Sequence, residues 1–417
     1  MNTAAVKIAI EARPLWAELE LLAGFSATAA PEVTRVVFSD QDLGARAWLK
    51  GLLREADLEV REDAVGNTFA RWVGTEAGLA PVGTGSHIDA IPSSGRFDGT
   101  VGVLGALEAI RALKRTGWQP RRSIELVLFT SEEPTRFGIG CLGSRLLSGT
   151  LSAERAGQMR DRAGSTLEQV RTEAGFGQDL DSVVLPAGYY SSFVELHIEQ
   201  GPLLEQKRTA IGVVTSIAAP ASLRLLIEGE GGHAGAVLMP GRKDALLGAA
   251  EIMLRVEEAA LKTGAIDTVA TTGVCQIFPG AVNSIPSRVC LEIDTRDTDL
   301  SRRDSVVAEI QKAALAVAEK RGLRVTSELL NADAPARSEP KILTAVERAC
   351  ELLGLSHRQM VSRAYHDSLF ISRVAPVAMI FIPSRGGVSH RPDEYSSPEQ
   401  VANGAAVLAH TLAELSA

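Results

Sequence analysis

The chain has 417 residues, of which 45% are hydrophobic and 23% are charged, and its formal net charge is −8. A negative charge without runs of lysine or arginine argues against a nucleic-acid-binding protein. No apolar stretch reaches the length of a membrane span, and the first residues lack the basic and apolar regions of a secretory signal. The four cysteines are widely spaced and form no C-x-x-C pair, so we expect reduced thiols in a cytoplasmic protein.

Most of the chain shows the pattern of an α/β protein, in which buried strands alternate with amphipathic helices. A mostly parallel mixed sheet covered by helices is therefore predicted. In chain order we expect a helix at 42–55, strands at 59–61 and near 87, a helix at 103–113, strands at 123–130 and 192–198, a helix from 342, a strand at 377–382 and a closing helix from 398.

The pattern changes between residues 215 and 333, where strands at 223–228, 268–277 and 289–294 accompany helices at 244–262 and 301–320. Two helices on a small, mostly antiparallel sheet form a compact α+β unit. We therefore predict one α/β domain made of 1–214 and 334–417, into which a smaller domain, 215–333, is inserted.

A turn-rich connection between a buried strand and a helix carries His87, Asp89 and Asp98. An imidazole and a carboxylate on loops at the end of a parallel strand suit a metal site. Asp89 is too close to His87 in sequence to be a second ligand, and it suits the role of accepting the other N–H of the imidazole. Taken alone, this short pattern is equally compatible with a solvated loop.

Further acidic and imidazole side chains follow other predicted strands. The candidate metal ligands are His87, Asp98, Glu133, His197 and His390. Three imidazoles and two carboxylates suit Zn²⁺ or Mn²⁺, and five ligands exceed the needs of one ion. We therefore expect two divalent ions that share Asp98 and activate a water between them. Glu132, next to Glu133, is then free to act as general base.

Eight runs of the sequence together resemble the amidase/carbamoylase branch of the dinuclear metallopeptidase family. They are HIDAIPSSGRFDG, SEEPTRFGIGCLGSR, ELHIEQGPLLE, GGHAGAVLMPGRKDA, PGAVNSIPS, EIDTRD, AYHD and GGVSHRPDEYSSPE. The resemblance implies a homodimer, two Mn²⁺ ions on the five ligands, Glu132 as general base, and an inserted domain that serves as lid and dimerisation domain. The ligand set alone leaves Zn²⁺ open.

The resemblance also implies substrate contacts in the inserted domain. Arg296 suits a substrate carboxylate, with Asn283 as an amide partner, although Arg296 could instead pair with a neighbouring aspartate. His233 is expected to cross the dimer interface and, as a catalytic group, to stabilise the oxyanion in the partner's site.

Three further residues are expected around the substrate. Gln200 and His366 would complete the pocket, although His366 could be structural. In SRAYHDSLF, Tyr365 takes the place of a small residue, which implies a pocket shallower than one for allantoate.

Within this branch, EEPTRF, HAGAVLMP and SRAYHDSLF are similar to the members that act on ureidoglycolate. The implied reaction is hydrolysis of (S)-ureidoglycolate to glyoxylate, ammonia and carbon dioxide, a step of ureide and purine catabolism. Allantoate amidohydrolases and N-carbamoyl-L-amino-acid hydrolases are alternatives that share every ligand. A catalytically idle, metabolite-binding family member is an alternative of another class, against which the intact Glu132 argues.

Overall fold

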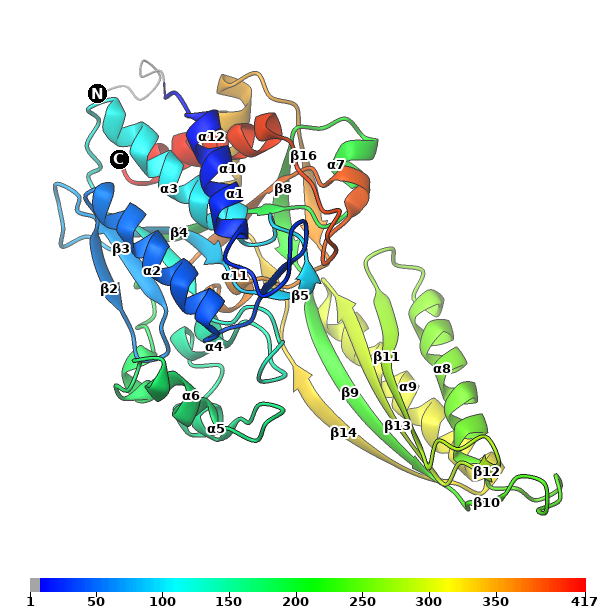
Figure 1. The fold of residues 1–417 in the computed structure, drawn as a ribbon. Helices are drawn as coiled ribbons and strands as arrows, with labels where there is room; N and C mark the ends of the chain where they lie inside the picture. Colours follow the sequence, from blue (N-terminus) through cyan, green and yellow to red (C-terminus); the bar gives the residue numbers. More distant parts are fainter. Residues whose placement is uncertain (1–7) are drawn as a thin grey trace. The chain divides into compact units, whose positions relative to one another are not determined.

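The computed structural model describes residues 8–417, which divide into two compact units (Figure 1). Unit 1 comprises the chain through Thr215 together with Arg337–Ser362 and His366–Ala417. Unit 2 comprises Ser216–Ala336 and the short segment Arg363–Tyr365. The sequence pattern places the insertion at 215–333 and contains no sign that three later residues group with it.

Unit 1 is built on a nine-stranded mixed sheet. Its centre consists of four parallel strands in the order β17 (Val377–Ile382), β7 (Ser192–Ile198), β4 (Val82–His87) and β6 (Ile124–Phe129). Antiparallel β3 (Thr68–Trp72) and β2 (Glu59–Glu62) extend it beyond β6. Beyond β17 lie β8 (Ile211–Ile217), β16 (His357–Ser362) and β15 (Ala336–Arg337). The predicted α/β class with a mixed sheet is confirmed, and its parallel part is the four central strands.

Helices cover both faces of this sheet (Figure 1). One face carries α1 (Ala12–Ala23), α2 (Asp40–Glu55), α3 (Thr100–Arg115), α10 (Pro340–Leu352) and α12 (Pro398–Leu415). The other carries α4 (Leu142–Leu147), α5 (Ala153–Gln158), α6 (Leu167–Glu173) and α11 (Asp367–Ile371). Strand β6 is buried on both faces because its side chains alternate between them. Leu126 and Leu128 belong to the hydrophobic core on the α3 face, whereas Val127 and Phe129 belong to the core on the α4 face.

Shorter elements complete unit 1. They are the β1 (Val33–Arg35) and β5 (Ala90–Ser94) pair, α7 (Leu203–Gln206), and 3₁₀ turns at Leu180–Val183 and Arg385–Gly387. None of the helices in residues 8–417 combines the length and apolar character that a membrane crossing requires.

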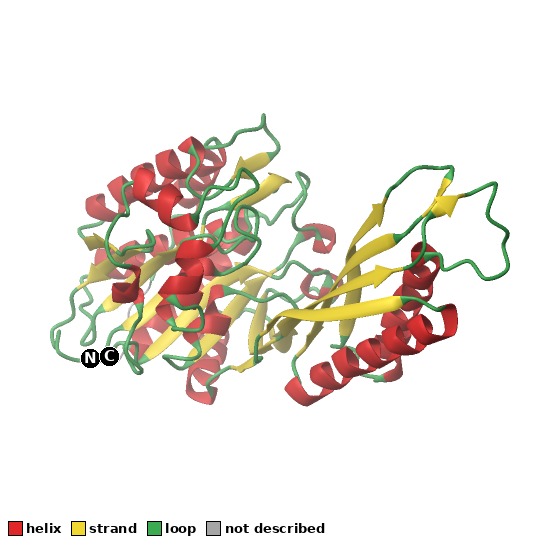
Figure 2. Ribbon diagram, turned by 90° about the horizontal axis from the view of Figure 1, so that it is seen from below, coloured by secondary structure: helices red, strands yellow, loops and turns green. Residues whose placement is uncertain are grey.

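Unit 2 is a four-stranded antiparallel sheet with two helices on one face (Figure 2). The strand order is β11 (Val269–Phe278), β13 (Arg288–Asp297), β9 (Ala219–Glu228) and β14 (Arg324–Ala332), and the helices are α8 (Ala245–Lys262) and α9 (Leu300–Arg321). A two-stranded ladder joins β10 (Gly232–His233) and β12 (Ser284–Ile285). Strand β14 lies at the sheet edge and has no buried residue, which explains why its sequence shows no apolar alternation.

Helix α3 packs directly against the sheet, with glycines facing the strands. A methyl group on Gly102 would lie 2.3 Å from the carbonyl oxygen of Leu196 on β7 and 2.6 Å from Cβ of Ser86 on β4. The start of α3, which follows Asp98, is therefore held directly against two central strands.

We expect Gly102→Ala to destabilise unit 1 and Gly51→Ala to stabilise it. Both glycines lie in helices, but a methyl group at Gly51 in α2 would meet nothing within 4 Å. Overpacking at Gly102 costs roughly 1–3 kcal/mol, whereas the lost backbone freedom of the unfolded chain at Gly51 contributes about 0.4–1 kcal/mol. Urea unfolding followed by circular dichroism measures both midpoints. Equal midpoints for the two variants would contradict the close packing of α3.

Candidate metal centre

The candidate ligands converge because three of them come from one edge of the parallel sheet. His87 is the last residue of β4, Glu133 follows β6, and His197 lies next to the end of β7. In the register of the sheet His87 pairs with Phe129, the last residue of β6. The carboxyl ends of parallel strands share an edge, and loops at this edge form binding sites in α/β proteins.

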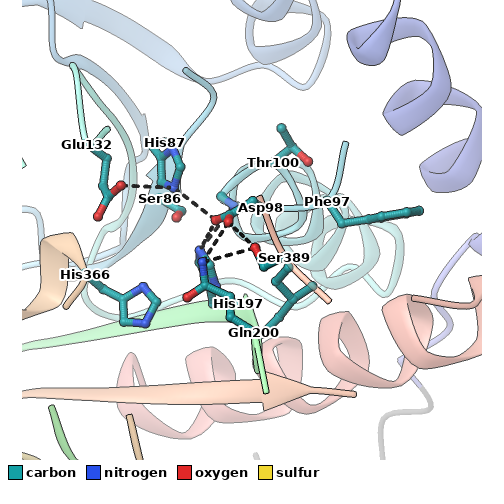
Figure 3. A network of polar contacts seen from close by, with 12 residues as sticks. Ser86, His87, Phe97, Asp98, Thr100, Glu132, His197, Gln200, His366 and Ser389 are labelled. Atoms are coloured by element: carbon teal, nitrogen blue, oxygen red, sulfur yellow. Dashed lines mark hydrogen bonds and ion pairs between the residues drawn. The ribbon is translucent and has the colours of Figure 1, made fainter. Parts of the chain in front are cut away.

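Asp98 belongs to two groups of potential ligands, of which Figure 3 shows the one with His87 and His197. Its Oδ1 atom is 3.6 Å from Nε2 of His87 and 3.2 Å from Nε2 of His197. Its Oδ2 atom is 3.4 Å from Nε2 of His390, which is 3.1 Å from Oε1 of Glu133. Within each group, His87–Asp98–His197 and Asp98–Glu133–His390, the potential ligand atoms lie within 4.8 Å of one another. The five residues predicted as metal ligands are thus brought together, and Asp98 belongs to both groups.

Two of the imidazoles are oriented by backbone carbonyl groups. Nδ1 of His197 lies 2.9 Å from the carbonyl oxygen of Ile198, and Nδ1 of His87 lies 3.1 Å from that of Asp89. A neutral ring that donates from Nδ1 directs the lone pair of Nε2 toward Asp98. Gly99 N–H donates to Nε2 of His197 over 3.1 Å, which agrees with this tautomer. Such rings are prepared to coordinate a metal ion.

The electrostatics of the centre favour a cation. Hydrogen bonds to Asp98 and Glu133 raise the pKa of His390 to about 11. Burial acts to lower the pKa of His87, but the charge of Glu132 and the nearby aspartates outweighs it and raises this pKa well above its ordinary value. Burial, opposed by His87 and reinforced by the charge of Glu133, raises the pKa of Glu132 well above its ordinary value. Imidazoles and buried carboxylates thus crowd the same small volume, so the residues present fit divalent cations.

Asp89 connects His87 with the Glu132–Glu133 pair. Its carboxylate accepts the N–H groups of Glu132 over 3.1 Å and of Glu133 over 3.0 Å. The carboxylate oxygen Oδ1 is 3.6 Å from Nδ1 of His87, which is farther than the backbone carbonyl of the same residue. The expected contact to the second ring nitrogen is thus made mainly by the backbone, and the carboxylate positions the two glutamates.

Asp98 is held by three residues that do not belong to either ligand group. Gln200 Nε2 and Ser389 Oγ each donate to Oδ2 of Asp98 over 2.7 Å (Figure 3). Glu394 accepts from the N–H group of Asp98 over 3.1 Å, and its Oε2 atom lies 3.0 Å from Oγ of Ser389. Gln200, predicted as a substrate contact, therefore contacts the shared carboxylate. The sequence reasoning missed Ser389 and Glu394, although both flank His390 in the run SHRPDE.

Gly99 leaves room for the ring of His87. Its φ of +65° lies in the left-handed region, and a methyl group here would lie 2.4 Å from Nε2 of His87. Any side chain at this position would therefore occupy the space of the ligand atom.

His366 packs against the same centre from the start of α11. It is buried, its ring centroid is 4.4 Å from that of His197, and its Nε2 atom is 3.1 Å from Oγ of Ser362 (Figure 3). The next residue, Asp367, is also buried and accepts from Oγ of Ser144 over 2.5 Å.

His233 and Asn283, both predicted to contact substrate, lie beside each other in unit 2. His233 pairs with Ser284 in the β10–β12 ladder, and the carbonyl oxygen of Asn283 accepts the N–H of Ala234 over 2.9 Å. Both side chains are exposed. Nδ1 of His233 accepts from the N–H of Gly235 over 3.1 Å, which leaves the proton of a neutral ring on Nε2.

Arg296 and Tyr365, the other predicted substrate contacts of unit 2, touch each other. The guanidinium of Arg296 lies 5.1 Å from the ring centroid of Tyr365. Nε of Arg296 also donates to Asp294 over 2.6 Å, so the alternative pairing with a neighbouring aspartate occurs. Arg363, two residues before Tyr365, forms an ion pair with Asp267 over 2.6 Å.

Comparisons with known proteins place the chain in a family. The ureidoglycolate hydrolase of Arabidopsis thaliana is 53% identical over 420 residues, which cover 99% of this chain and 88% of that protein. The crystal structures of AtUAH in complex with glyoxylate and with (S)-hydroxyglycine each have a TM-score of 0.92 at 52% identity, covering all of both chains. Residues 83–414 match the model of peptidase family M20/M25/M40, and the chain therefore belongs to this family.

Proposed function

We propose that this protein is a metal-dependent amidohydrolase that hydrolyses (S)-ureidoglycolate. The observation that carries the proposal is the centre around Asp98, in which two candidate ligand groups share one carboxylate and Glu132 lies alongside without belonging to either group. A similar protein is named ureidoglycolate hydrolase, and a similar structure is titled as a complex with (S)-hydroxyglycine. This compound is the amino-hydroxy acid that hydrolysis of the ureido C–N bond would release.

We propose that the centre binds two Mn²⁺ ions, with Zn²⁺ as the alternative. His87 and His197 would hold one ion, Glu133 and His390 the other, and Asp98, which belongs to both groups, would be shared. Bound there, the ions supply Lewis-acid activation of water and of the ureido carbonyl.

Glu132 performs the proton transfers in the proposed reaction. Its Oε2 atom lies 3.7 Å from Nε2 of His87, so it faces the ligand groups. It removes a proton from the attacking water and passes it to the leaving nitrogen, and the C–N bond breaks to give hydroxyglycine and carbamate. These products decompose to glyoxylate, ammonia and carbon dioxide.

The substrate carboxylate is assigned to Arg296, with Asn283 as an amide partner. A guanidinium forms two parallel hydrogen bonds with a carboxylate, and Arg296 is half-buried and held by Asp294, so little side-chain entropy is lost on binding. Tyr365, against this guanidinium, fills space that a longer ureide such as allantoate would need. Gln200 and His366 complete our proposed substrate site.

We further propose a cytoplasmic homodimer in which unit 2 provides the lid and the dimer contacts. Several large apolar side chains near β10 and β12 are exposed, namely Leu238 and Met239 after β10, Phe278 at the end of β11 and Val282 before β12. Such a patch favours a protein interface. His233 lies in β10 and is itself exposed, and its Nε2–H would donate to the oxyanion that develops in the partner's site.

The first test is a panel of substrates. With added Mn²⁺, we expect ammonia release from (S)-ureidoglycolate to exceed that from allantoate and from N-carbamoyl-L-amino acids. Glu132→Gln serves as the control, because its amide is nearly isosteric but cannot accept a proton, and it should lose at least ~10²-fold in rate. Faster turnover of allantoate would overturn the substrate assignment, and full activity of the control would remove Glu132 as the base.

Metal content tests the bridging role of Asp98. After dialysis, Asp98→Ala should lose both ions because it belongs to both ligand groups, whereas His87→Ala and Glu133→Ala should each mainly lose one. Asp393→Ala is a matched control, since this carboxylate is exposed and pairs with Arg391. Equal metal content in all three ligand variants would contradict a shared ligand.

Mixed dimers test the position of His233. If it acts in the partner's site, His233→Ala and Glu132→Gln are each nearly inactive alone. A heterodimer of the two has one site that lacks both groups and one site that is complete. We therefore expect partial recovery of activity after the two variants are dissociated and reassociated together. Confirmed heterodimers without recovery would place His233 in its own subunit's site or outside catalysis.

A further inference from the structure

A buried thiol touches the side chain of Glu132. Cys141 is 0% exposed, and its Sγ atom donates to Oε1 of Glu132 over 3.3 Å. Burial, reinforced by the negative charges of Glu132 and Asp367, raises the pKa of Cys141 well above its ordinary value. The sulfur therefore keeps its hydrogen and remains a donor.

The backbone holds Cys141 opposite Glu132. The N–H of Cys141 donates to the carbonyl oxygen of Glu132 over 2.7 Å, and Leu142 and Gly143 donate in the same way to Ser131 and Thr130. Cys141 has left-handed backbone angles of φ 57° and ψ 37°, directly before α4. A residue other than glycine is uncommon in this conformation, and it persists here because the three backbone bonds impose it.

These contacts leave Glu132 one oxygen for chemistry. The N–H of Glu132 donates to Asp89. Cys141 donates to the carbonyl oxygen of Glu132 through its N–H and to Oε1 through its thiol, and Oε2 of Glu132 faces His87. A carboxylate with one oxygen held cannot rotate to exchange its two oxygens without breaking that bond. The thiol thus determines which oxygen reaches the ligand groups.

We propose that Cys141 is a positioning residue for Glu132, which it orients by donating its thiol hydrogen to Oε1. The inference rests on the proposed function, in which Glu132 is the general base. It predicts that removal of the donor slows the chemical step and leaves substrate and metal binding intact.

Two substitutions distinguish the loss of the hydrogen-bond donor at Cys141 from the loss of its side-chain volume. Cys141→Ala removes both the sulfur and the hydrogen bond, whereas Cys141→Ser keeps an O–H donor. With (S)-ureidoglycolate and Mn²⁺, we expect kcat of the alanine variant to fall about 3- to 10-fold at unchanged KM and metal content. The serine variant should recover most of this loss. Cys350→Ala, at another fully buried cysteine in α10, controls for a lost sulfur and should keep kcat.

A double substitution shows whether Cys141 acts through Glu132. In a Glu132→Gln background, Cys141→Ala should cause no further loss of kcat, because the base it orients is already absent. An additive loss, a serine variant as slow as the alanine variant, or an alanine variant with normal kcat would each overturn the proposal. An inactive unmodified protein would instead overturn the proposed function, so the two failures are distinguishable.

Discussion

The carboxylate of Asp98 is the point on which the centre depends, because chain segments from distant parts of the sequence meet on its two oxygens. Oδ1 faces rings delivered by β4 and β7, and Oδ2 faces His390, Gln200 and Ser389 from the loops after β7 and β17. Its backbone is bonded in turn by Glu394. The carboxylate is only 7% exposed, and the rings of His87 and His197 are buried, so their contacts act in a low-dielectric environment.

Burial of this many acids is costly unless positive charge compensates it. Asp89, Asp98, Glu132, Glu133, Glu394 and Asp367 are all buried in this region. Burial and the charge of Asp98 raise the pKa of Glu394 to about 7, and burial and the charge of Glu195 raise that of Asp367 to about 8. The fold meets part of this cost with backbone N–H groups, which bond Asp89 and Glu394. The part of the burial cost that these hydrogen bonds do not offset favours the binding of a cation.

The sequence was most informative where burial is continuous. Strands β7 and β17 are fully buried runs, and both were predicted at their observed bounds, because an apolar run between turn residues has few other interpretations. Edge strand β14 could not be predicted, because it has no buried residue and its sequence, RVTSELLNA, shows no regular apolar alternation. The candidate ligands could be identified because His and carboxylates followed such strands. Ser389 and Glu394 could not, since serine and glutamate in a polar loop are indistinguishable from solvated residues until their partners are known. The contact of Gln200 with Asp98 could not be predicted for the same reason.

The short segment Arg363–Tyr365 has a consequence for how proteins with this fold can be recombined. It belongs to unit 2 through Arg363–Asp267 and Tyr365–Arg296, yet it follows the long insertion in the chain and is flanked on both sides by unit 1. A crossover at the ends of 216–336 would therefore inherit Asp267 and Arg296 from one parent and Arg363 and Tyr365 from the other. Exchange of the insertion between related genes would separate both pairs, so these four positions must be inherited together for the contacts to persist.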